Sequence, residues 1–180
     1  MGLRDRMQDR REERRGDDNV HFQMRQKLAS IGDDYWIQDQ AGTRVYKVTG
    51  TALRIRETLI FEDAQGNELA KIQERKLRVR DTMNIEDAAG NTIATVKKAM
   101  ITPLRDRWHV SMGEGPDIDI KGNILDHEYT LELDGRKVGE VSKRWVRLAD
   151  TYGVEVAPDQ NPVVVLAITA VLDEMAHEGR

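Results

Sequence analysis

The feature that most constrains this chain is an apolar run near the end of its 180 residues. From Val163 to Leu172 there is one hydroxyl, on Thr169, and no charge. Asn161 is a favourable N-cap residue, and Pro162 suits the first position of a helix. The sequence therefore predicts a helix over about 162–176 that is apolar on every side. Such a helix belongs in a membrane or in the middle of a protein core.

The length of the run decides between these two environments. A bilayer span needs roughly 20 apolar residues, whereas a run of about 10–14 is more typical of a buried helix. Asp173 and Glu174 follow the run directly. We therefore predict no transmembrane span and a core helix that the rest of the chain encloses.

The composition argues against several classes of function. The chain has 28 basic and 32 acidic residues, and this net charge of −4 does not favour nucleic-acid binding. It has no cysteine, which excludes disulfides, thiolate catalysis and cysteine metal sites. The charged N-terminus lacks the apolar segment of a secretion signal. The expected location is the cytoplasm, including the membrane periphery.

The first twenty residues differ from the rest of the chain in their charge pattern. They contain six arginines and six acidic residues, with like charges four positions apart at Arg6 and Arg10 and at Asp9 and Glu13. Such pairs destabilise a helix, and no apolar stripe is present to dock it. We expect residues 1–20 to form a flexible arm or frayed helix, with partner binding as the alternative. Residues 21–180 are expected to form one domain.

From about Val20 the chain alternates between short apolar–polar runs and turns. An Asp-x-x-Gly pattern recurs every 24 residues, at Asp39, Asp63 and Asp87. Asp caps backbone N–H groups in such a turn and Gly adopts the positive φ, so each pattern predicts a hairpin. Asp134-Gly135 predicts a fourth. The predicted strands are 22–28, 34–39, 43–49, 52–62, 68–75, 82–87, 92–99, 107–113, 116–121, 127–133, 136–145 and 151–157.

Short connections between successive strands indicate an antiparallel meander. A long sheet tends to close, which removes its edges. A barrel of twelve strands is too wide for its own side chains to fill, because about eight strands already give a just-filled interior. The predicted fold is therefore mainly β: a closed, antiparallel, twelve-stranded barrel around a central hydrophobic C-terminal helix.

Catalytic and metal-binding patterns are weak. The four histidines lack metal-site spacing, and the sequence contains neither a nucleophile elbow nor a phosphate-binding loop. No cofactor is expected. One alternative is a cation-dependent hydrolase using Asp117, Asp119, Asp126 and His127, although ordinary turn and surface carboxylates are far commoner than such a site.

The basic residues offer a second candidate site. Anionic lipid headgroups bind clusters of Lys and Arg. An alternative is an ordinary solvated face, paired with Glu62, Glu68, Glu74 and Glu86. The candidate headgroup-binding residues are Arg75, Lys76, Arg78, Arg80, Lys143 and Arg144.

Several stretches resemble the LURP-one-related family, whose fold is shared with the tubby C-terminal domain and phospholipid scramblases. Besides the Asp-x-x-Gly hairpins, the similar segments are 24–28 leading to 32–37, Ile101 to Arg107, Lys121 to Tyr129, Val141 to Trp145, and Asp150 to Val156. The resemblance covers roughly residues 20–176. It implies a twelve-stranded barrel threaded by a C-terminal helix. It also implies links to plant defence, phosphoinositides or lipid, and supplies no catalytic residue set.

Three hypotheses follow. The first is a non-catalytic binding or scaffold protein of the LURP-one-like type, with an unidentified protein partner. The second is a peripheral protein that binds anionic phospholipid or phosphoinositide headgroups through a basic face. The third is the hydrolase. Neither the ligand nor the oligomeric state follows from the sequence.

Overall fold

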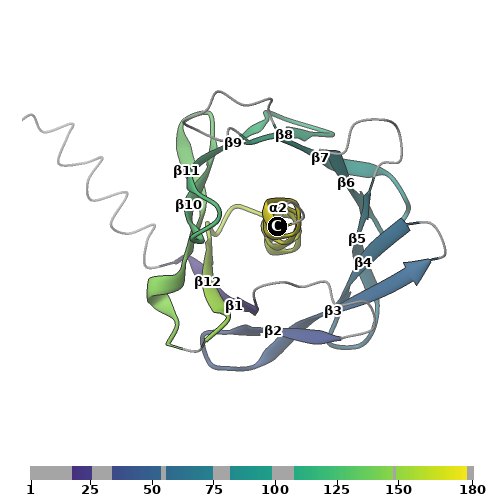
Figure 1. Cartoon of the computed structure of the whole chain (residues 1–180), viewed down its shortest axis with the longest axis horizontal. Helices are drawn as coiled ribbons and strands as arrows, with labels where there is room; N and C mark the ends of the chain where they lie inside the picture. The colour runs from purple at the N-terminus through teal and green to yellow at the C-terminus, as the bar shows by residue number, and fades with distance from the viewer. Residues whose placement is uncertain are drawn as a thin grey trace, which may run out of the picture.

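The computed structural model describes residues 18–25, 34–53, 56–74, 82–98, 108–147 and 149–177. Within these ranges the chain forms twelve strands, a short 3₁₀ helix and one long α-helix (Figure 1). The elements are β1 (Val20–Arg25), β2 (Tyr35–Asp39), β3 (Arg44–Leu53), β4 (Arg56–Asp63), β5 (Glu68–Glu74), β6 (Thr82–Asp87), β7 (Thr92–Lys98), β8 (Trp108–Met112), β9 (Ile118–Asn123), β10 (Glu128–Leu133), β11 (Arg136–Ser142), η1 (Lys143–Trp145), β12 (Thr151–Val156) and α2 (Pro162–His177).

The strands form a closed barrel in which each strand pairs with its neighbours in sequence. The ring closes where β1 pairs antiparallel with β12, from Val20 opposite Val156 to Arg25 opposite Thr151. This confirms the predicted closed antiparallel meander. Closure gives each of the twelve described strands two partners, so none of them keeps a long free edge that could pair with another chain.

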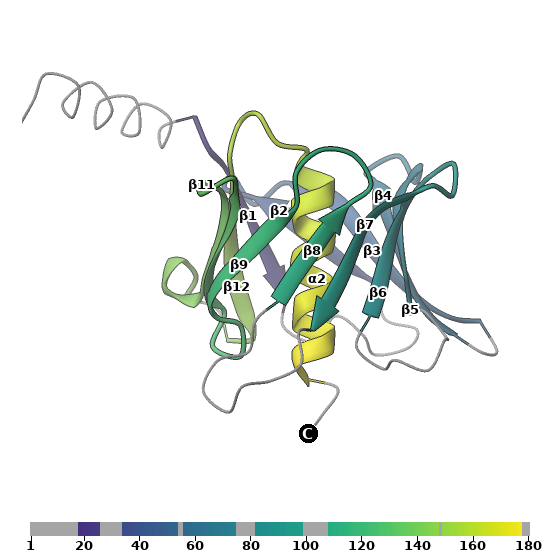
Figure 2. The ribbon, with the colours of Figure 1, turned by 90° about the horizontal axis from the view of Figure 1, so that it is seen from above.

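The α2 helix runs through the middle of this ring (Figures 1 and 2). It begins as predicted: Asn161 Oδ1 accepts a hydrogen bond from the Val163 N–H at 3.0 Å. Every residue from Val165 to Leu172 is at most 1% exposed. The one hydroxyl in the run, on Thr169, donates to the Val165 carbonyl at 2.9 Å and so remains satisfied inside the barrel.

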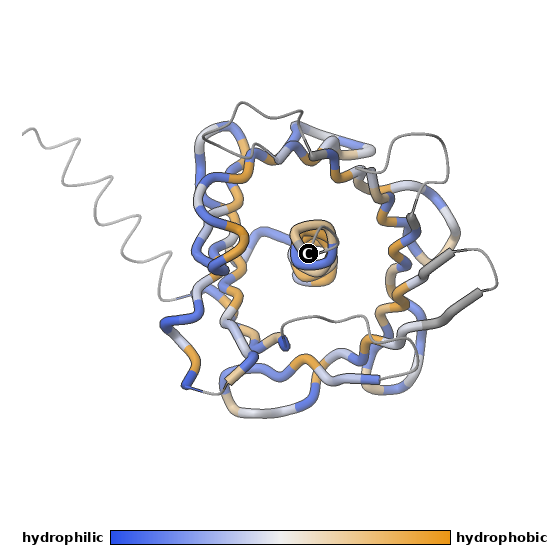
Figure 3. The backbone as a smooth tube through the Cα atoms, viewed as in Figure 1, coloured by the Kyte–Doolittle hydropathy of each residue, from blue (hydrophilic) through white to orange (hydrophobic). Residues whose placement is uncertain are grey.

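The inner face of the wall supplies the other half of the core. Apolar and polar residues alternate along the strands (Figure 3), and the buried apolar residues of the strands belong to the same core as those of the helix. In β6, for example, Met83 and Ile85 are buried while their neighbours are partly exposed. Each large side chain buried in this way contributes roughly 1.5–3 kcal/mol of apolar transfer free energy. Together the wall and the helix form one continuous core.

The Asp-x-x-Gly turns have the predicted chemistry. Asp63 Oδ1 accepts hydrogen bonds from the N–H groups of Gln65 at 2.9 Å and Asn67 at 2.8 Å. The glycine of each turn has a positive φ, between 78° and 87°. At the fourth hairpin both Asp134 and Gly135 have positive φ, as a type I′ turn requires.

Two details of the predicted elements are wrong. The β3–β4 hairpin does not turn near Gly50, which pairs with Leu59 inside the ladder; a glycine without positive φ is compatible with a strand. The predicted strand 136–145 ends at Ser142, after which η1 begins. Helix α2 ends at His177, in agreement with the predicted range of about 162–176, and Asp173 is buried within it at 2% exposure.

The N-terminal arm falls mostly outside the described residues, which begin at residue 18. Among the residues that the structure does describe, no helix combines the length and the apolar character that crossing a bilayer demands.

The dependence of the barrel on its helix can be tested by truncation. A chain ending at Pro158 lacks the side chains that fill the ring, so it should give insoluble protein or a molten state without cooperative unfolding. Thermal unfolding followed by near-ultraviolet circular dichroism measures this. A chain ending at His177 keeps the whole of α2 and serves as the control. A cooperative transition in the Pro158 truncation would contradict the model of a helix-filled barrel.

The turn chemistry predicts a pH dependence. Hydrogen bonds from the Asn67 side chain and backbone lower the pKa of Asp63 below its ordinary value. The carboxylate therefore stabilises the fold above the unfolded-state pKa, and this contribution is lost as the pH falls through the folded-state value. Asn67→Ala should raise the pKa of Asp63 in an NMR titration. Asp87, held in the same way by Asn91, is the internal control and should not move.

Candidate binding surface

The structure describes two of the six predicted headgroup-binding residues. Arg75, Lys76, Arg78 and Arg80 lie outside the described residues, between β5 and β6. Lys143 and Arg144 lie side by side on η1, on the outside of the wall after β11. Only these last two can be placed, and the surface around them is the candidate site.

Ser142 turns the chain out of the sheet at this point. Its backbone is extended, with φ of −149°, and its side-chain oxygen accepts a hydrogen bond from the Arg144 N–H at 3.2 Å. The Val146 N–H then donates to the Lys143 carbonyl at 3.3 Å and closes the single turn. A serine at this position caps the turn in the usual way.

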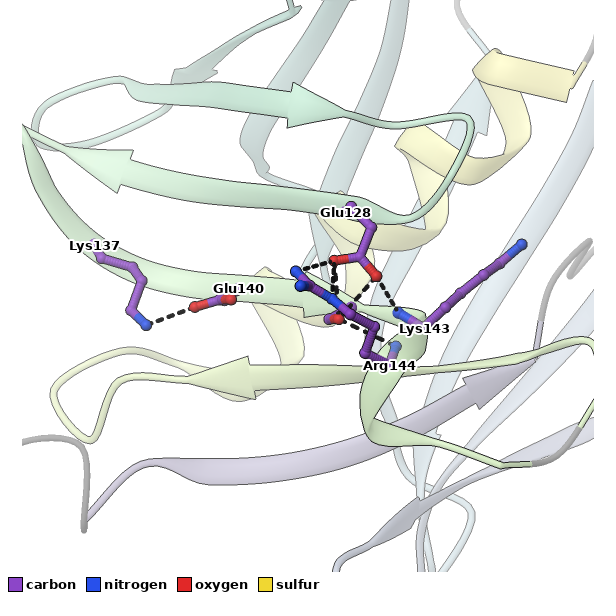
Figure 4. A network of polar contacts seen from close by, with 6 residues as sticks. Glu128, Lys137, Glu140, Lys143 and Arg144 are labelled. Atoms are coloured by element: carbon purple, nitrogen blue, oxygen red, sulfur yellow. Dashed lines mark hydrogen bonds and ion pairs between the residues drawn. The ribbon is translucent and has the colours of Figure 1, made fainter.

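Glu128, at the start of β10, holds η1 in place (Figure 4). Its carboxylate accepts hydrogen bonds from Ser142 Oγ at 2.9 and 3.0 Å and from the Lys143 N–H at 3.2 Å. It also accepts from Arg144 Nε at 3.2 Å and Nη2 at 2.8 Å. Partial burial acts to raise the pKa of Glu128, but the hydrogen bonds from Arg144, Ser142 and Lys143 outweigh it and lower the pKa.

The two predicted cations therefore have different roles. Arg144 donates from Nε and Nη2 to one oxygen of Glu128, Oε2, and this ion pair positions the turn while the Arg144 side chain stays 79% exposed. The Lys143 side chain extends away from Glu128 (Figure 4). Of the pair, Lys143 is the one whose ammonium group points away from this network.

Trp145, the last residue of η1, lies against the outside of β12. A Cβ atom on Gly153 would come within 3.0 Å of Trp145 Cε3, so the missing side chain is what lets the indole approach the strand. The ring also meets His21 of β1 edge to face, with centroids 5.8 Å apart. Trp145 nevertheless remains 43% exposed. We call Lys143, Arg144, Trp145 and exposed Arg147 the η1 surface.

A chain of ion pairs supports the wall beneath the η1 surface. Glu155 lies between His21, at 3.2 Å from Nε2, and Lys137, at 3.0 Å from Nζ. Lys137 also pairs with Glu140 at 2.7 Å (Figure 4). Burial acts to lower the pKa of Lys137, but the bonds to Glu140 and Glu155 outweigh it and raise the pKa. These contacts connect β1, β11 and β12.

The residues of the hydrolase hypothesis do not converge. Asp117 binds His109 at 2.9 Å, and Asp126 binds Asn123 at 2.6 Å, both on the outside of the barrel. His127 instead points inward and meets Asp173 at 2.6 Å, with both side chains 1% exposed. Among the described residues, no three His, Asp or Glu side chains are grouped to hold a metal ion.

The structure shows two ion pairs of the kind expected if the basic residues form an ordinary solvated face. Lys71 pairs with Glu68 at 3.4 Å, and Glu62 lies 3.9 Å from Lys47. Sequence reasoning missed the anchor Glu128 and the partner of His127. Glu128 directly follows His127 in sequence, but its contacts lie fourteen to sixteen residues away along the chain, and no local pattern reports such a pair.

Comparison with known proteins identifies the family of this chain and a solved structure with a similar fold. The family model described as LURP-one-related matches residues 20–173. The chain belongs to the LURP-one-related family. Among solved structures, it resembles the X-ray structure of an Arabidopsis thaliana protein, with a TM-score of 0.65 and 14% sequence identity over 88% of this chain and 92% of that one. This likeness shows the shared fold alone. A search of curated proteins gave no match.

The anchoring role of Glu128 can be measured directly. Glu128→Gln removes the charge that holds Arg144 and should lower the free energy of unfolding by about 1–2 kcal/mol, because the site is partly exposed and partly screened. Chemical denaturation measures the change. Glu132→Gln is the matched control: Glu132 sits on the same strand and pairs with Lys121, whereas the Glu128 carboxylate accepts hydrogen bonds from Ser142 and the Lys143 N–H in addition to its ion pair. Equal losses in the two variants would contradict the anchoring role.

Proposed function

We propose that this LURP-one-related protein is a non-catalytic binding module and that its partner contacts the outside of the barrel. The interior supports this proposal, because α2 and the inward side chains of the wall together form one buried core. A barrel filled by its own helix offers its outer surface and rims for recognition.

Within that outer surface, the η1 surface supports binding best. Trp145 carries a large apolar ring that is 43% exposed yet held against Gly153 and His21. A ring fixed in this way loses little conformational freedom when a partner covers it. This exposed, positioned indole is the observation on which the proposal rests.

The chemistry around Trp145 favours an anionic partner, and we propose phospholipid or phosphoinositide headgroups as the specific class. Tryptophan is enriched where proteins meet the membrane interface, and Lys and Arg near an anionic leaflet contribute about 1 kcal/mol each. Lys143 and Arg147 flank the indole, whereas Arg144 is paired with Glu128. Arg75, Lys76, Arg78 and Arg80 remain a second proposed group for the same ligand.

The net charge of −4 sets a condition on this interaction. The protein as a whole is repelled by an anionic membrane, so attraction has to come from local basic groups. Beyond a Debye length of about 8 Å at physiological salt, exposed charges are largely screened. Headgroup binding should therefore be short-ranged and should weaken as salt increases.

Sedimentation with vesicles of phosphatidylcholine and phosphatidylserine tests the proposal. Wild-type protein should sediment at low salt, and Lys143→Glu should weaken binding about 30-fold, since reversing one charge changes the interaction by roughly 2 kcal/mol. Lys97→Glu makes the same charge change at an exposed position on β7 and should bind like wild type. Trp145→Ala should weaken binding without removing its salt dependence.

The second basic group needs its own variant. Reversing Lys76, Arg78 and Arg80 to Glu while leaving η1 intact shows whether that group contributes. If wild-type protein fails to sediment at low salt, the headgroup proposal is wrong and a protein partner becomes the favoured one. If the η1 variants and Lys97→Glu bind equally, headgroup binding does not use the η1 surface.

A further inference from the structure

A row of titratable side chains crosses the wall of the barrel beside the η1 surface. In the strand ladders Glu155 of β12 lies directly opposite His21 of β1 on one side and Glu140 of β11 on the other. Side chains placed opposite one another in this way interact, and two like charges destabilise each other. The carboxylates of Glu140 and Glu155 are therefore stabilised by positive charge next to them.

A single lysine compensates both of these carboxylates. Lys137 Nζ lies 2.7 Å from Glu140 (Figure 4) and 3.0 Å from Glu155 Oε1. Two negative charges and one positive charge leave this group at −1 while His21 is neutral. The Glu155 side chain is only 13% exposed, so solvent ions screen its charge less than that of an exposed group. We call Glu140, Glu155, Lys137 and His21 the outer charge row.

His21 is positioned to supply the missing positive charge. Its Nε2 lies 3.2 Å from Glu155 Oε2, the oxygen that Lys137 does not contact. A carboxylate only accepts hydrogen bonds, so Nε2 carries a hydrogen in both forms of the ring. The proton that changes the charge is therefore the one on Nδ1, which is buried and has no hydrogen-bond partner among the described residues.

The imidazole of His21 also contacts the exposed ring of the η1 surface. The rings of His21 and Trp145 form a T-shaped contact, with centroids 5.8 Å apart and planes at 73°. This separation is shorter than the Debye length of about 8 Å at physiological salt. A molecule that covers Trp145 therefore experiences the charge of the outer charge row beside it.

Other charged groups lie on the elements next to His21. On η1, Arg144 pairs with Glu128 at 2.8 Å, and the Lys143 side chain extends away from that pair (Figure 4). On β2, the carboxylate of Asp39 accepts hydrogen bonds from two N–H groups of its own turn, both at 2.9 Å. Among these residue types, only histidine ordinarily changes its charge between about pH 5 and 8.

We propose that His21 is a proton-controlled switch for the η1 surface, and this inference rests on the headgroup binding proposed above. With a neutral His21, the outer charge row keeps one uncompensated negative charge next to Trp145, and this charge repels anionic headgroups. A proton on His21 cancels that charge and leaves the basic groups of the η1 surface as they are. Binding of anionic headgroups therefore strengthens as the pH falls.

Vesicle sedimentation at two pH values tests the switch. Wild-type protein should bind vesicles of phosphatidylcholine and phosphatidylserine about fivefold more tightly at about pH 5.5 than at about pH 8, which is the effect of one added positive charge near an anionic leaflet. His21→Gln keeps a donor for Glu155 but does not gain a proton, so it should lose most of this ratio. His109→Gln should keep the ratio. This control fits because His109 also pairs with a carboxylate, Asp117 at 2.9 Å, but lies on β8, four strands from β12 in the ring.

A second variant leaves the His21 ring in place. Glu155→Gln removes one negative charge of the outer charge row, so at about pH 8 it should bind the same vesicles about fivefold more tightly than wild type. Affinity equal to that of wild type would contradict the switch.

NMR spectroscopy of the full chain without lipid gives a readout that does not depend on headgroup binding. The indole N–H resonance of Trp145 should move with the same midpoint as the ring signals of His21 in a pH titration, because the two rings are in contact. In His21→Gln this movement should be absent, whereas His109→Gln should retain it.

The outcomes separate the switch from the function on which it rests. Vesicle binding whose pH dependence survives in His21→Gln would overturn the switch and leave headgroup binding intact. A Trp145 resonance that does not follow His21 would do the same. Absence of vesicle binding at both pH values would overturn headgroup binding and the switch together.

Discussion

The structure depends on one packing constraint: a ring of twelve strands encloses more space than its inward side chains can fill. The chain solves this with α2, which has no polar face in its central part and so can be surrounded on all sides. The wall and the helix therefore stabilise each other. Without the wall the helix would expose its apolar surface to water, and without the helix the wall would enclose a void whose lining loses its packing partners. The same constraint leaves the outer surface and the rims of the barrel for the proposed binding.

The outer surface is organised differently from the core. Inside, packing is mostly apolar and includes the buried pair of His127 and Asp173. Outside, carboxylates that bind particular neighbours hold the hairpins and η1 in position. Asp63 and Asp87 shape hairpins through backbone N–H groups, and Glu128 holds η1 through Arg144, Ser142 and Lys143. Although Lys143 and Arg144 are adjacent in sequence, one points away from the network and the other stabilises the turn. A basic dipeptide is therefore not automatically a binding site for anions.

Membership of the LURP-one-related family fits this division between core and surface. Fold similarity at 14% identity shows that a barrel with a central helix tolerates extensive substitution. Such a core needs apolar side chains of about the right volume and leaves most outward positions free to vary. The function of this chain then has to be sought in local outer features, of which the η1 surface has an exposed aromatic ring on a held backbone.

The sequence by itself determined the strand number, the hairpin turns and the central helix, because alternation, turn residues and an uninterrupted apolar run act over a few neighbouring residues. It also predicted the N-cap at Asn161 correctly. Strand ends were less well determined, since Gly50 is compatible with both a turn and a strand and Ser142 acts as a cap only where Glu128 meets it. Only the tertiary structure decided which charges pair and which side chains meet inside the barrel. Asp173 reads as the end of an apolar run but is buried against His127, a residue 46 positions away, because closing the barrel brings distant parts of the chain into contact.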